Sequence, residues 1–303
     1  MKLVRYLCEK HLCEDIECYG FLVADRVVCL HSLAQLFDAK FPPLFKDFIA
    51  LGASAVETAE RLFENASKRD RARASSPVNQ ATLLTPIAFP PTIICLGLNY
   101  RDHVSETGAS IPDEPIIFIK PHTTIIGPNE KIVKPKFVKK LDYEAELAIV
   151  IGRRTKNISV SEAESCIFGY TILNDVSARD IQFKDKQWTR GKSFDTFAPT
   201  GPCITTVDQL QDVSDLSIRT WVNNELRQNS TTKSMIFNVY EIVHQLSRVM
   251  TLEPCDIIAT GTPAGVGFTW KPHPKLLQAG DTVRIEIESI GVLENTVVDQ
   301  QRS

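Results

Sequence analysis

The segment DYEAELAIVIG, residues 142–152, decides the fold prediction. Its first half carries the carboxylates of Glu144 and Glu146, and side chains two residues apart point to the same face of a strand. Its second half, residues 147–151, is a continuous apolar run. We therefore predict a strand that presents two neighbouring carboxylates where the acidic face meets a core.

Two carboxylates this close repel each other, and burial raises the free-energy cost further. A hard cation removes the repulsion because it takes oxygen ligands. Asp142 could join the pair, and Asp175 follows the strand-like segment 169–173, so it could add a ligand from a neighbouring strand end. Asp180 is predicted to pair with a basic side chain instead. Three carboxylates leave positions on an octahedral ion open for water and substrate. The alternative is an acidic strand edge that faces solvent.

Three further segments carry reactive side chains. His103 and Glu106 are spaced to share one face of a helical turn, where a carboxylate can orient a histidine as a general base. Lys192 follows a glycine and could stabilise an oxyanion. The Gly-rich segment 261–267 fits neither a dinucleotide fingerprint nor a P-loop, but its amides and Thr262 could bind a small carboxylate. Each feature taken alone is also compatible with a purely structural role.

The chain divides into two predicted parts. Residues 1–40 contain short strands, and residues 42–66 follow a helical period. Residues 66–80, ASKRDRARASSPVNQ, are polar, charged and rich in serine, which is typical of a linker. We therefore predict a small N-terminal accessory domain over residues 1–80 and a catalytic domain over residues 81–303.

The second part is rich in strands and poor in helices. Residues 281–298 alternate apolar and polar side chains, which predicts an antiparallel sheet with one solvated face. A helix is predicted over residues 161–168, with Ser161 and Glu164 as a capping box. Another is predicted over residues 238–250, where apolar side chains form one face.

Composition excludes several classes of function. The 303 residues are 43% hydrophobic, with 34 basic and 37 acidic residues and a formal net charge of −3, so neither nucleic acid nor a membrane surface is an expected partner. No run of eighteen apolar residues is present, and the opening residues lack the apolar core of a signal peptide. We expect a cytoplasmic protein, or one of the mitochondrial matrix if the source is eukaryotic.

The eight cysteines are dispersed and form no CxxC pair. We therefore expect buried free thiols in a reducing compartment. The even spacing of Cys8, Cys13 and Cys18 leaves a metal role open for them.

Six of these segments, in fixed order, resemble the fumarylacetoacetate hydrolase family. They are LGLNYRDHVSE, IIFIKP, DYEAELAIVIG, GYTILNDVSARDIQ, GKSFDTFAPTGP and TLEPCDIIATGTPAGVG, within residues 85–300. The stretch KQWTRGKSFDTFAPTGPCI is most similar to the subgroup of fumarylacetoacetate hydrolase domain-containing proteins. The resemblance implies a mixed, mainly β fold with a β-sandwich roll core, a small α+β N-terminal domain and assembly as a homodimer. One departure is Cys255, where the family usually has glycine, and we expect it to affect a turn rather than the chemistry.

The resemblance also assigns roles to the residues already singled out. It implies a metal site for Mg²⁺, Mn²⁺ or Ca²⁺ formed by Glu144, Glu146 and Asp175. His103 and Glu106 match the family's water-activating pair on a lid, and Lys192 a catalytic lysine. The implied substrate-binding residues are Arg179, Gln182, Lys192 and Thr262.

The implied activity is enolate chemistry on small 2-oxo acids held on the metal. Hydrolysis of a C–C bond in acylpyruvates or other 1,3-diketo acids is the first expectation, with His103 and Glu106 activating the water. Tautomerisation or decarboxylation of oxaloacetate on the same site is the close alternative. A protein that binds such metabolites without catalysis is the alternative from a different class.

Overall fold

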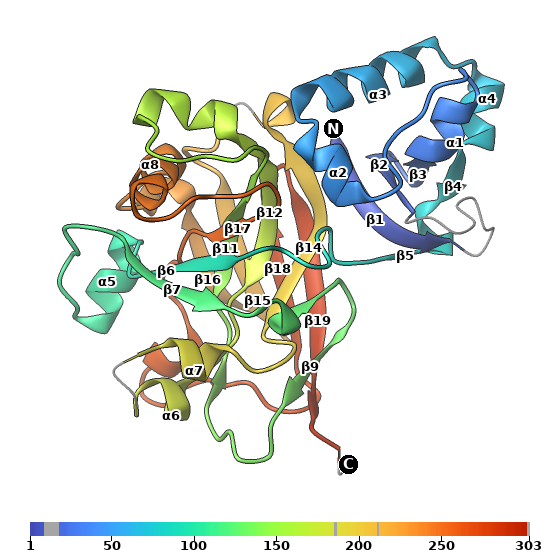
Figure 1. The fold of residues 1–303 in the computed structure, drawn as a ribbon. Helices are drawn as coiled ribbons and strands as arrows, with labels where there is room; N and C mark the ends of the chain where they lie inside the picture. Colours follow the sequence, from blue (N-terminus) through green and yellow to red (C-terminus); the bar gives the residue numbers. More distant parts are fainter. Residues whose placement is uncertain (9–17, 185–186, 211, 302–303) are drawn as a thin grey trace.

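A computed structural model describes residues 1–8, 18–184, 187–210 and 212–301, and its centre is one large mixed sheet (Figure 1). Among the described residues this sheet has 12 strands, of which ten follow the order β4-β3-β2-β1-β14-β12-β11-β17-β6-β7, while β5 pairs with β1 and β8 with β14. The strands are β1 (Lys2–Cys8), β2 (Tyr19–Val23), β3 (Arg26–Cys29), β4 (Ser75–Pro77), β5 (Ala81–Leu83), β6 (Ile93–Gly97), β7 (Ile116–Lys120), β8 (Ile125–Ile126), β11 (Ala145–Ile151), β12 (Ile167–Asn174), β14 (Ala198–Thr206) and β17 (Ile257–Ala259).

A second sheet supplies the other side of the main core. Its order is β16-β15-β18-β19-β9, and a separate short pair joins β10 to β13. The strands are β9 (Lys131–Lys134), β10 (Leu141–Asp142), β13 (Ser177–Ala178), β15 (Ser217–Val222), β16 (Glu225–Thr231), β18 (Thr282–Ile287) and β19 (Gly291–Asp299). The β18–β19 hairpin is antiparallel and buries alternate apolar side chains, so the prediction for residues 281–298 is confirmed.

Strand β11 lies between two cores because its apolar side chains alternate. Leu147 and Ile149 belong to a cluster with Ile218 and Ile285 of the second sheet, whereas Val150 packs in a cluster with residues of the N-terminal helices. Burial on both faces explains the uninterrupted apolar run after Glu146. The mixed, mainly β fold predicted from the sequence is confirmed.

Helices lie at the margins of the sheets (Figure 1). Four cover the N-terminal strands, α5 precedes β7, α6 and α7 lie beside each other, and α8 contacts the 3-10 turn at residues 160–162. Their bounds are α1 (Leu30–Gln35), α2 (Phe45–Ala50), α3 (Ala53–Asn65), α4 (Lys68–Arg73), α5 (Arg101–Thr107), α6 (Arg179–Gln182), α7 (Thr189–Lys192) and α8 (Val239–Val249). No helix in the described part of the chain is long and apolar enough to cross a membrane.

The linker predicted over residues 66–80 is wrong. Its charged half forms α4, capped by the Ser67 hydroxyl, which accepts a hydrogen bond from the Asp70 amide. Its serine-rich half forms β4, which pairs with β3. Serine and charged residues there serve as a helix cap and an edge strand rather than as a flexible connection. The division into domains at residue 80 stays a prediction.

Two local predictions also need correction. Residues 160–166 form two 3-10 turns instead of a helix, and the capping box joins Ser159 to Glu162, two residues earlier than predicted. The chain then enters β12 at Ile167, because the apolar residues that follow continue as a strand. Residue Asp180 accepts a hydrogen bond from the backbone amide of Lys139 at 2.8 Å, and no basic side chain among the described residues pairs with it.

The cysteines divide into two groups. Free buried thiols are confirmed for Cys29, Cys95, Cys166, Cys203 and Cys255. The same expectation is wrong for Cys18, which is disulfide-bonded. The metal role left open for Cys18 is therefore also wrong, because a disulfide sulfur is not a thiolate ligand. Cys13 and the side chain of Cys8 lie outside the described residues, so the same role stays untested for them.

Residue Cys255 has a positive φ of 71° before β17, as expected of a turn position where glycine is common.

Candidate active site

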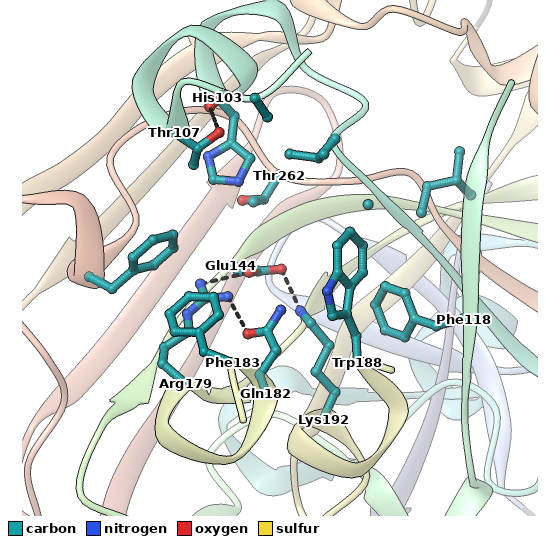
Figure 2. Close-up of a pocket in the computed structure, with 15 residues that line it drawn as sticks. His103, Thr107, Phe118, Glu144, Arg179, Gln182, Phe183, Trp188, Lys192 and Thr262 are labelled. Atoms are coloured by element: carbon teal, nitrogen blue, oxygen red, sulfur yellow. Dashed lines mark hydrogen bonds and ion pairs between the residues drawn. The ribbon is translucent and has the colours of Figure 1, made fainter. Parts of the chain in front are cut away.

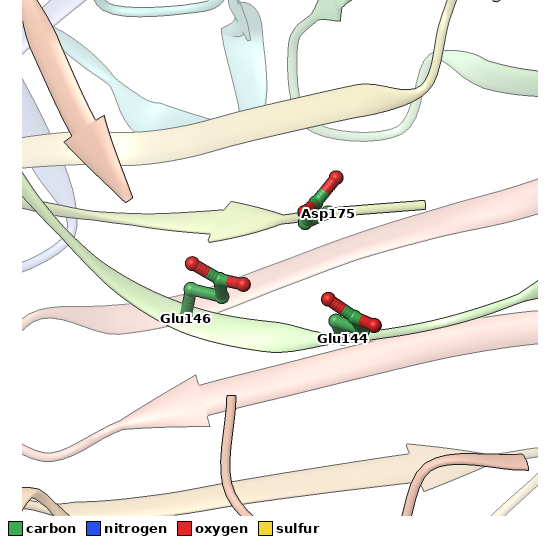
Figure 3. A group of neighbouring side chains, drawn as sticks. All are labelled: Glu144, Glu146 and Asp175. Atoms are coloured by element: carbon green, nitrogen blue, oxygen red, sulfur yellow. The ribbon is translucent and has the colours of Figure 1, made fainter. Parts of the chain in front are cut away.

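Three carboxylates converge at the end of β11 (Figure 3). Glu146 lies on this strand, Glu144 directly precedes it, and Asp175 directly follows the neighbouring strand β12. One carboxylate oxygen from each residue lies within 4.8 Å of the other two, and all three side chains are buried. The antiparallel pairing of Ala145 with Asn174 produces this arrangement, because it sets Asp175 across from Glu144. The sequence predicted this grouping.

Buried cations surround the three carboxylates. The Lys192 ammonium lies 2.8 Å from Glu144 Oε2 and 2.7 Å from Asp175 Oδ2. The Lys120 ammonium donates to the other Asp175 oxygen at 2.5 Å, and the Arg179 guanidinium lies 2.7 Å from Glu144 Oε1. These contacts satisfy Glu144 and Asp175 on both oxygens, so both carboxylates are held in fixed orientations.

Residue Glu146 is the exception within the group. One of its oxygens accepts a hydrogen bond from the Gly261 amide at 2.8 Å, whereas Oε1 is buried with no hydrogen-bond partner among the described residues. Burial, followed by repulsion from Asp175 and Glu144, raises the pKa of Glu146 well above its usual range. At Glu144 burial acts in the same direction, but the adjacent Lys192 and Arg179 outweigh it and lower the pKa to about 2.

This donor set fits a divalent cation. Three buried carboxylates supply hard oxygen ligands, and the unpartnered oxygen of Glu146 is a buried acceptor that a cation would satisfy.

A cavity of about 260 Å³ opens above Glu144 (Figure 2). Its polar lining brings together side chains from five separate parts of the chain, and its apolar lining includes Phe118 and Trp188. The polar side chains are His103, Thr107, Glu144, Arg179, Gln182, Lys192 and Thr262. Every substrate-binding and catalytic residue predicted from the sequence therefore lines this cavity, except Glu106.

The residue Glu106 acts on the cavity through His103. Both lie on α5, where the Glu106 carboxylate is 3.3 Å from His103 Nδ1. The other carboxylate oxygen accepts hydrogen bonds from the Gly265 amide at 3.0 Å and the Thr269 hydroxyl at 2.7 Å. Burial opposes ionisation of Glu106, but hydrogen bonds from His103 and Thr269 outweigh it and lower its pKa. A carboxylate at Nδ1 favours the tautomer that carries the proton there, which leaves Nε2 as the basic nitrogen.

Short helices α6 and α7 hold the cationic side of the cavity. A Cβ added to Gly191 would lie 2.7 Å from the backbone and Cβ of Gln182, so only glycine lets the two helices approach this closely. Arg179 is held by Gln182, whose side-chain oxygen accepts from its Nη1 at 2.9 Å, and by the ring of Phe268 beneath its guanidinium.

Residue Asp142 does not join the three carboxylates. Its Oδ2 accepts from Arg179 Nε at 2.9 Å, and its oxygens also accept from the amides of Gly267 and Phe268. It therefore ties the arginine of α6 to the Gly-rich loop. Asp142 is an anchor of the site rather than one of the converging ligands.

Two residues of this region were not singled out from the sequence. Lys120 lies at the end of β7 within the quoted IIFIKP motif, and Gln228 lies on β16. Both are buried polar side chains, at 1% and 0% exposure. A lysine that ends an apolar strand is a usable signal, whereas Gln228 follows no pattern that distinguishes it from a surface glutamine.

Comparison with known proteins places these residues in context. The family described as "Fumarylacetoacetate (FAA) hydrolase C-terminal" matches residues 92–298. A fumarylacetoacetate hydrolase domain-containing protein 2 homolog of Dictyostelium discoideum is 40% identical over 308 residues, which span 98% of this chain and 97% of that protein. A mitochondrial oxaloacetate tautomerase of Xenopus laevis is 43% identical over 264 residues, which span 86% of this chain and 81% of the relative.

Solved structures show the same fold. A fumarylacetoacetate hydrolase from psychrophilic Exiguobacterium antarcticum aligns with a TM-score of 0.81 at 35% identity, over 99% of this chain and 100% of that one. The maleylpyruvate hydrolase of Sphingobium sp. SYK-6, solved with manganese(II) ion and pyruvate, aligns with a TM-score of 0.78 at 29% identity, again over 99% of this chain and 100% of that one.

Proposed function

The chain belongs to the fumarylacetoacetate hydrolase family and is an enzyme of that family, and we propose that it interconverts the enol and keto forms of oxaloacetate with a divalent cation. The observation that carries the proposal is the buried Glu146 oxygen without a partner, set among carboxylates beneath a cavity lined by cations. Relatives that are 39–45% identical and named oxaloacetate tautomerases support the choice of substrate.

Glu144, Glu146 and Asp175 would hold the cation, which we take to be Mg²⁺ or Mn²⁺. When bound, it supplies a Lewis acid that favours negative charge on the oxygens of a 2-oxo acid. The manganese and pyruvate in the maleylpyruvate hydrolase of Sphingobium sp. SYK-6 support both the type of ion and the class of ligand.

The substrate-binding groups supply positive charge and one hydroxyl. Arg179 and Lys192 line the cavity as buried cations, so they favour a dianionic oxo acid over a neutral one. Gln182 keeps the guanidinium of Arg179 in place. Thr262 lines the same cavity from the Gly-rich loop and offers a hydrogen bond to a carboxylate oxygen.

The proton transfer is assigned to His103. Conversion of the enol to the keto form removes a proton from the enol oxygen and adds one to carbon 3, so no atom is gained or lost overall. Nε2 of His103 accepts a proton in this exchange and returns it, while Glu106 at Nδ1 holds the imidazole and stabilises its positive charge. Lys192 offers its ammonium to the negative charge that develops on the substrate oxygens.

Hydrolysis of a C–C bond in an acylpyruvate is the second candidate. The paired His103 and Glu106 favour it, because the same Nε2 could take a proton from a water molecule instead of from the enol oxygen. Decarboxylation of oxaloacetate needs the same anion-stabilising groups. Relatives named as a tautomerase and as hydrolases favour catalysis over binding without catalysis.

Turnover of three substrates with Mg²⁺ or Mn²⁺ tests the proposal. We expect conversion of enol oxaloacetate to exceed hydrolysis of acetylpyruvate and of fumarylpyruvate by at least tenfold in kcat/KM. Asp175→Ala should abolish the metal-dependent rate, and His103→Gln should lower kcat by about 100-fold or more. Faster cleavage of either acylpyruvate would favour the hydrolase, and turnover that persists without a metal would contradict the assigned site.

A further inference from the structure

The amide of Gln228 connects the metal-ligand strand to the substrate-binding threonine. Gln228 lies on β16 and is fully buried. Its side-chain oxygen accepts from the Ala145 amide at 3.1 Å, and its nitrogen donates to the Pro263 carbonyl at 2.9 Å. A backbone amide can only donate and a carbonyl can only accept, so these two contacts fix which end of the side chain is oxygen and which is nitrogen.

This orientation determines the hydrogen bond of Thr262. The second hydrogen on the Gln228 nitrogen points to Thr262 Oγ1 at 2.8 Å, so the threonine oxygen is an acceptor there. The Thr220 hydroxyl donates to the Gln228 oxygen at 2.8 Å and completes its hydrogen bonding. Because the Thr262 oxygen accepts this hydrogen bond from Gln228, its hydroxyl hydrogen remains available for an acceptor in the cavity that Thr262 lines.

The backbone around Thr262 leaves little room for another arrangement. Gly265 has a φ of 103°, and a Cβ added to it would lie 2.1 Å from the carbonyl oxygen of Arg227, the neighbour of Gln228. The Gly-rich loop therefore rests directly on β16. Ala145, held by the same glutamine, separates the two glutamates of the proposed metal site.

We propose that Gln228 is a positioning residue that makes Thr262 a hydrogen-bond donor to the carboxylate of a 2-oxo acid. This inference rests on the proposed function, since it requires an anionic ligand in the cavity. A ligand that offered a donor to Thr262 would be disfavoured. Gln228 itself does not touch the ligand, so it favours a carboxylate only by orienting the Thr262 hydroxyl.

Binding of pyruvate to the full chain loaded with Mn²⁺, measured by calorimetry, tests the inference. Gln228→Glu keeps an oxygen for Ala145 and Thr220, but its second oxygen can donate to neither Pro263 nor Thr262. That oxygen would instead accept from the Thr262 hydroxyl, so the hydroxyl hydrogen would turn away from the cavity. We expect the Kd for pyruvate to rise about tenfold or more, as for loss of a hydrogen bond to a charged group, while the Kd for Mn²⁺ changes less than twofold. An equal loss of Mn²⁺ affinity would overturn the inference, because it would indicate a general structural role.

A double-mutant cycle separates positioning from packing. Thr262→Val should weaken pyruvate binding about tenfold, and Thr262→Ser, which keeps the hydroxyl, less than threefold. Gln228→Glu should cause no further loss in the Thr262→Val background, whereas additive losses would overturn the inference.

Gln228→Met introduces an uncharged side chain of similar volume. It can replace Gln228→Glu in the same double-mutant cycle if the Gln228→Glu protein does not fold. It should weaken pyruvate binding less than Gln228→Glu does, and its loss should also vanish beside Thr262→Val. Failure of the unsubstituted chain to bind pyruvate with either metal would contradict the proposed function instead, before any variant is compared.

Discussion

The carboxylates of the site differ in how their charges are balanced. Asp175 is held at one oxygen by Lys120 and at the other by Lys192, and Glu144 lies between Lys192 and Arg179. Glu146 contacts none of these cations and has one backbone amide as its donor. Burial of a charge without a counterion destabilises a fold, so the proposed cation, rather than stability, would account for a carboxylate at Glu146.

Substitution of Glu146 by glutamine should therefore have opposite effects on folding and on metal binding. In EDTA we expect Glu146→Gln to raise the free energy of unfolding by about 1–3 kcal/mol. The raised pKa of Glu146 means that the metal-free fold must either take up a proton there or bury a charge, and a neutral amide requires neither. With free Mn²⁺ at about 100 times its Kd the unsubstituted chain should gain about 2.7 kcal/mol, and the variant should gain none. Urea denaturation with and without Mn²⁺ measures both quantities.

The matched control is Glu294→Gln, which makes the same change on an exposed position of β19. It should leave both measurements unchanged within about 0.5 kcal/mol. A less stable Glu146→Gln protein in EDTA would show that this carboxylate supports the fold through contacts other than a cation.

Some site residues could be predicted from the sequence because their spacing has a direct geometric meaning. Glu144 and Glu146 are two apart in a strand, and His103 and Glu106 are three apart on a helix, so each pair could be assigned to one face. The contacts of Lys120 with Asp175 and of Gln228 with Thr262 join residues far apart in the chain. Such contacts depend on how the strands pair, so they cannot be deduced from the spacing of residues along the sequence.

Helix α5 closes one side of the cavity through two acidic contacts. Glu106 accepts from Gly265 of the Gly-rich loop and from Thr269 just after it, and Asp102 accepts from the Ser230 hydroxyl of β16 at 2.6 Å. The helix has only seven residues, so its position depends on these contacts more than on its own stability.

The contact of Glu106 should respond to acid. Its pKa is lowered in the folded chain, so its contacts contribute fully above its usual value of 4.5 and are lost as the pH falls through the lowered value. We expect protection of the Gly265 amide against hydrogen exchange to decrease between about pH 6 and about pH 3, relative to core amides of β11. NMR exchange rates corrected for intrinsic rates would measure this.

Glu106→Gln is the control, because its amide oxygen can still accept from Gly265 and Thr269 but does not titrate over this range. The variant should show no pH step at Gly265. The same step in both proteins would place the responsible group elsewhere.

At the level of elements, long periodic segments could be predicted, and short capped ones could not. The helix over residues 238–250 and the hairpin over residues 281–298 both formed where their patterns placed them. The linker prediction for residues 66–80 failed because linkers, helix caps and edge strands share a polar composition. The helix prediction for residues 161–168 failed because the four apolar residues of this segment fit a turn entering a strand as well as a helix.

At the scale of the whole molecule, the N-terminal strands are part of the sheet that carries the site. β1 pairs with β14, which pairs with β12, and β12 ends at Asn174, directly before Asp175. The side chains of β1 also share a core with β11 and β17. The accessory domain predicted over residues 1–80 therefore shares hydrogen bonds and apolar contacts with the strands of the candidate active site.

This continuity predicts that the chain unfolds as one unit. Leu3 is fully buried in the shared core, so Leu3→Ala should lower the free energy of unfolding by about 2–5 kcal/mol in a single transition. Leu7→Ala makes the same change on the same strand at a side chain that is 61% exposed, and should cost less than about 0.5 kcal/mol. Denaturation followed by both circular dichroism and tryptophan fluorescence should give coincident curves, because the tryptophans at 188, 221 and 270 lie outside the N-terminal part. If Leu3→Ala instead shifted an early transition and left the fluorescence curve in place, residues 1–80 would fold independently of the active-site strands.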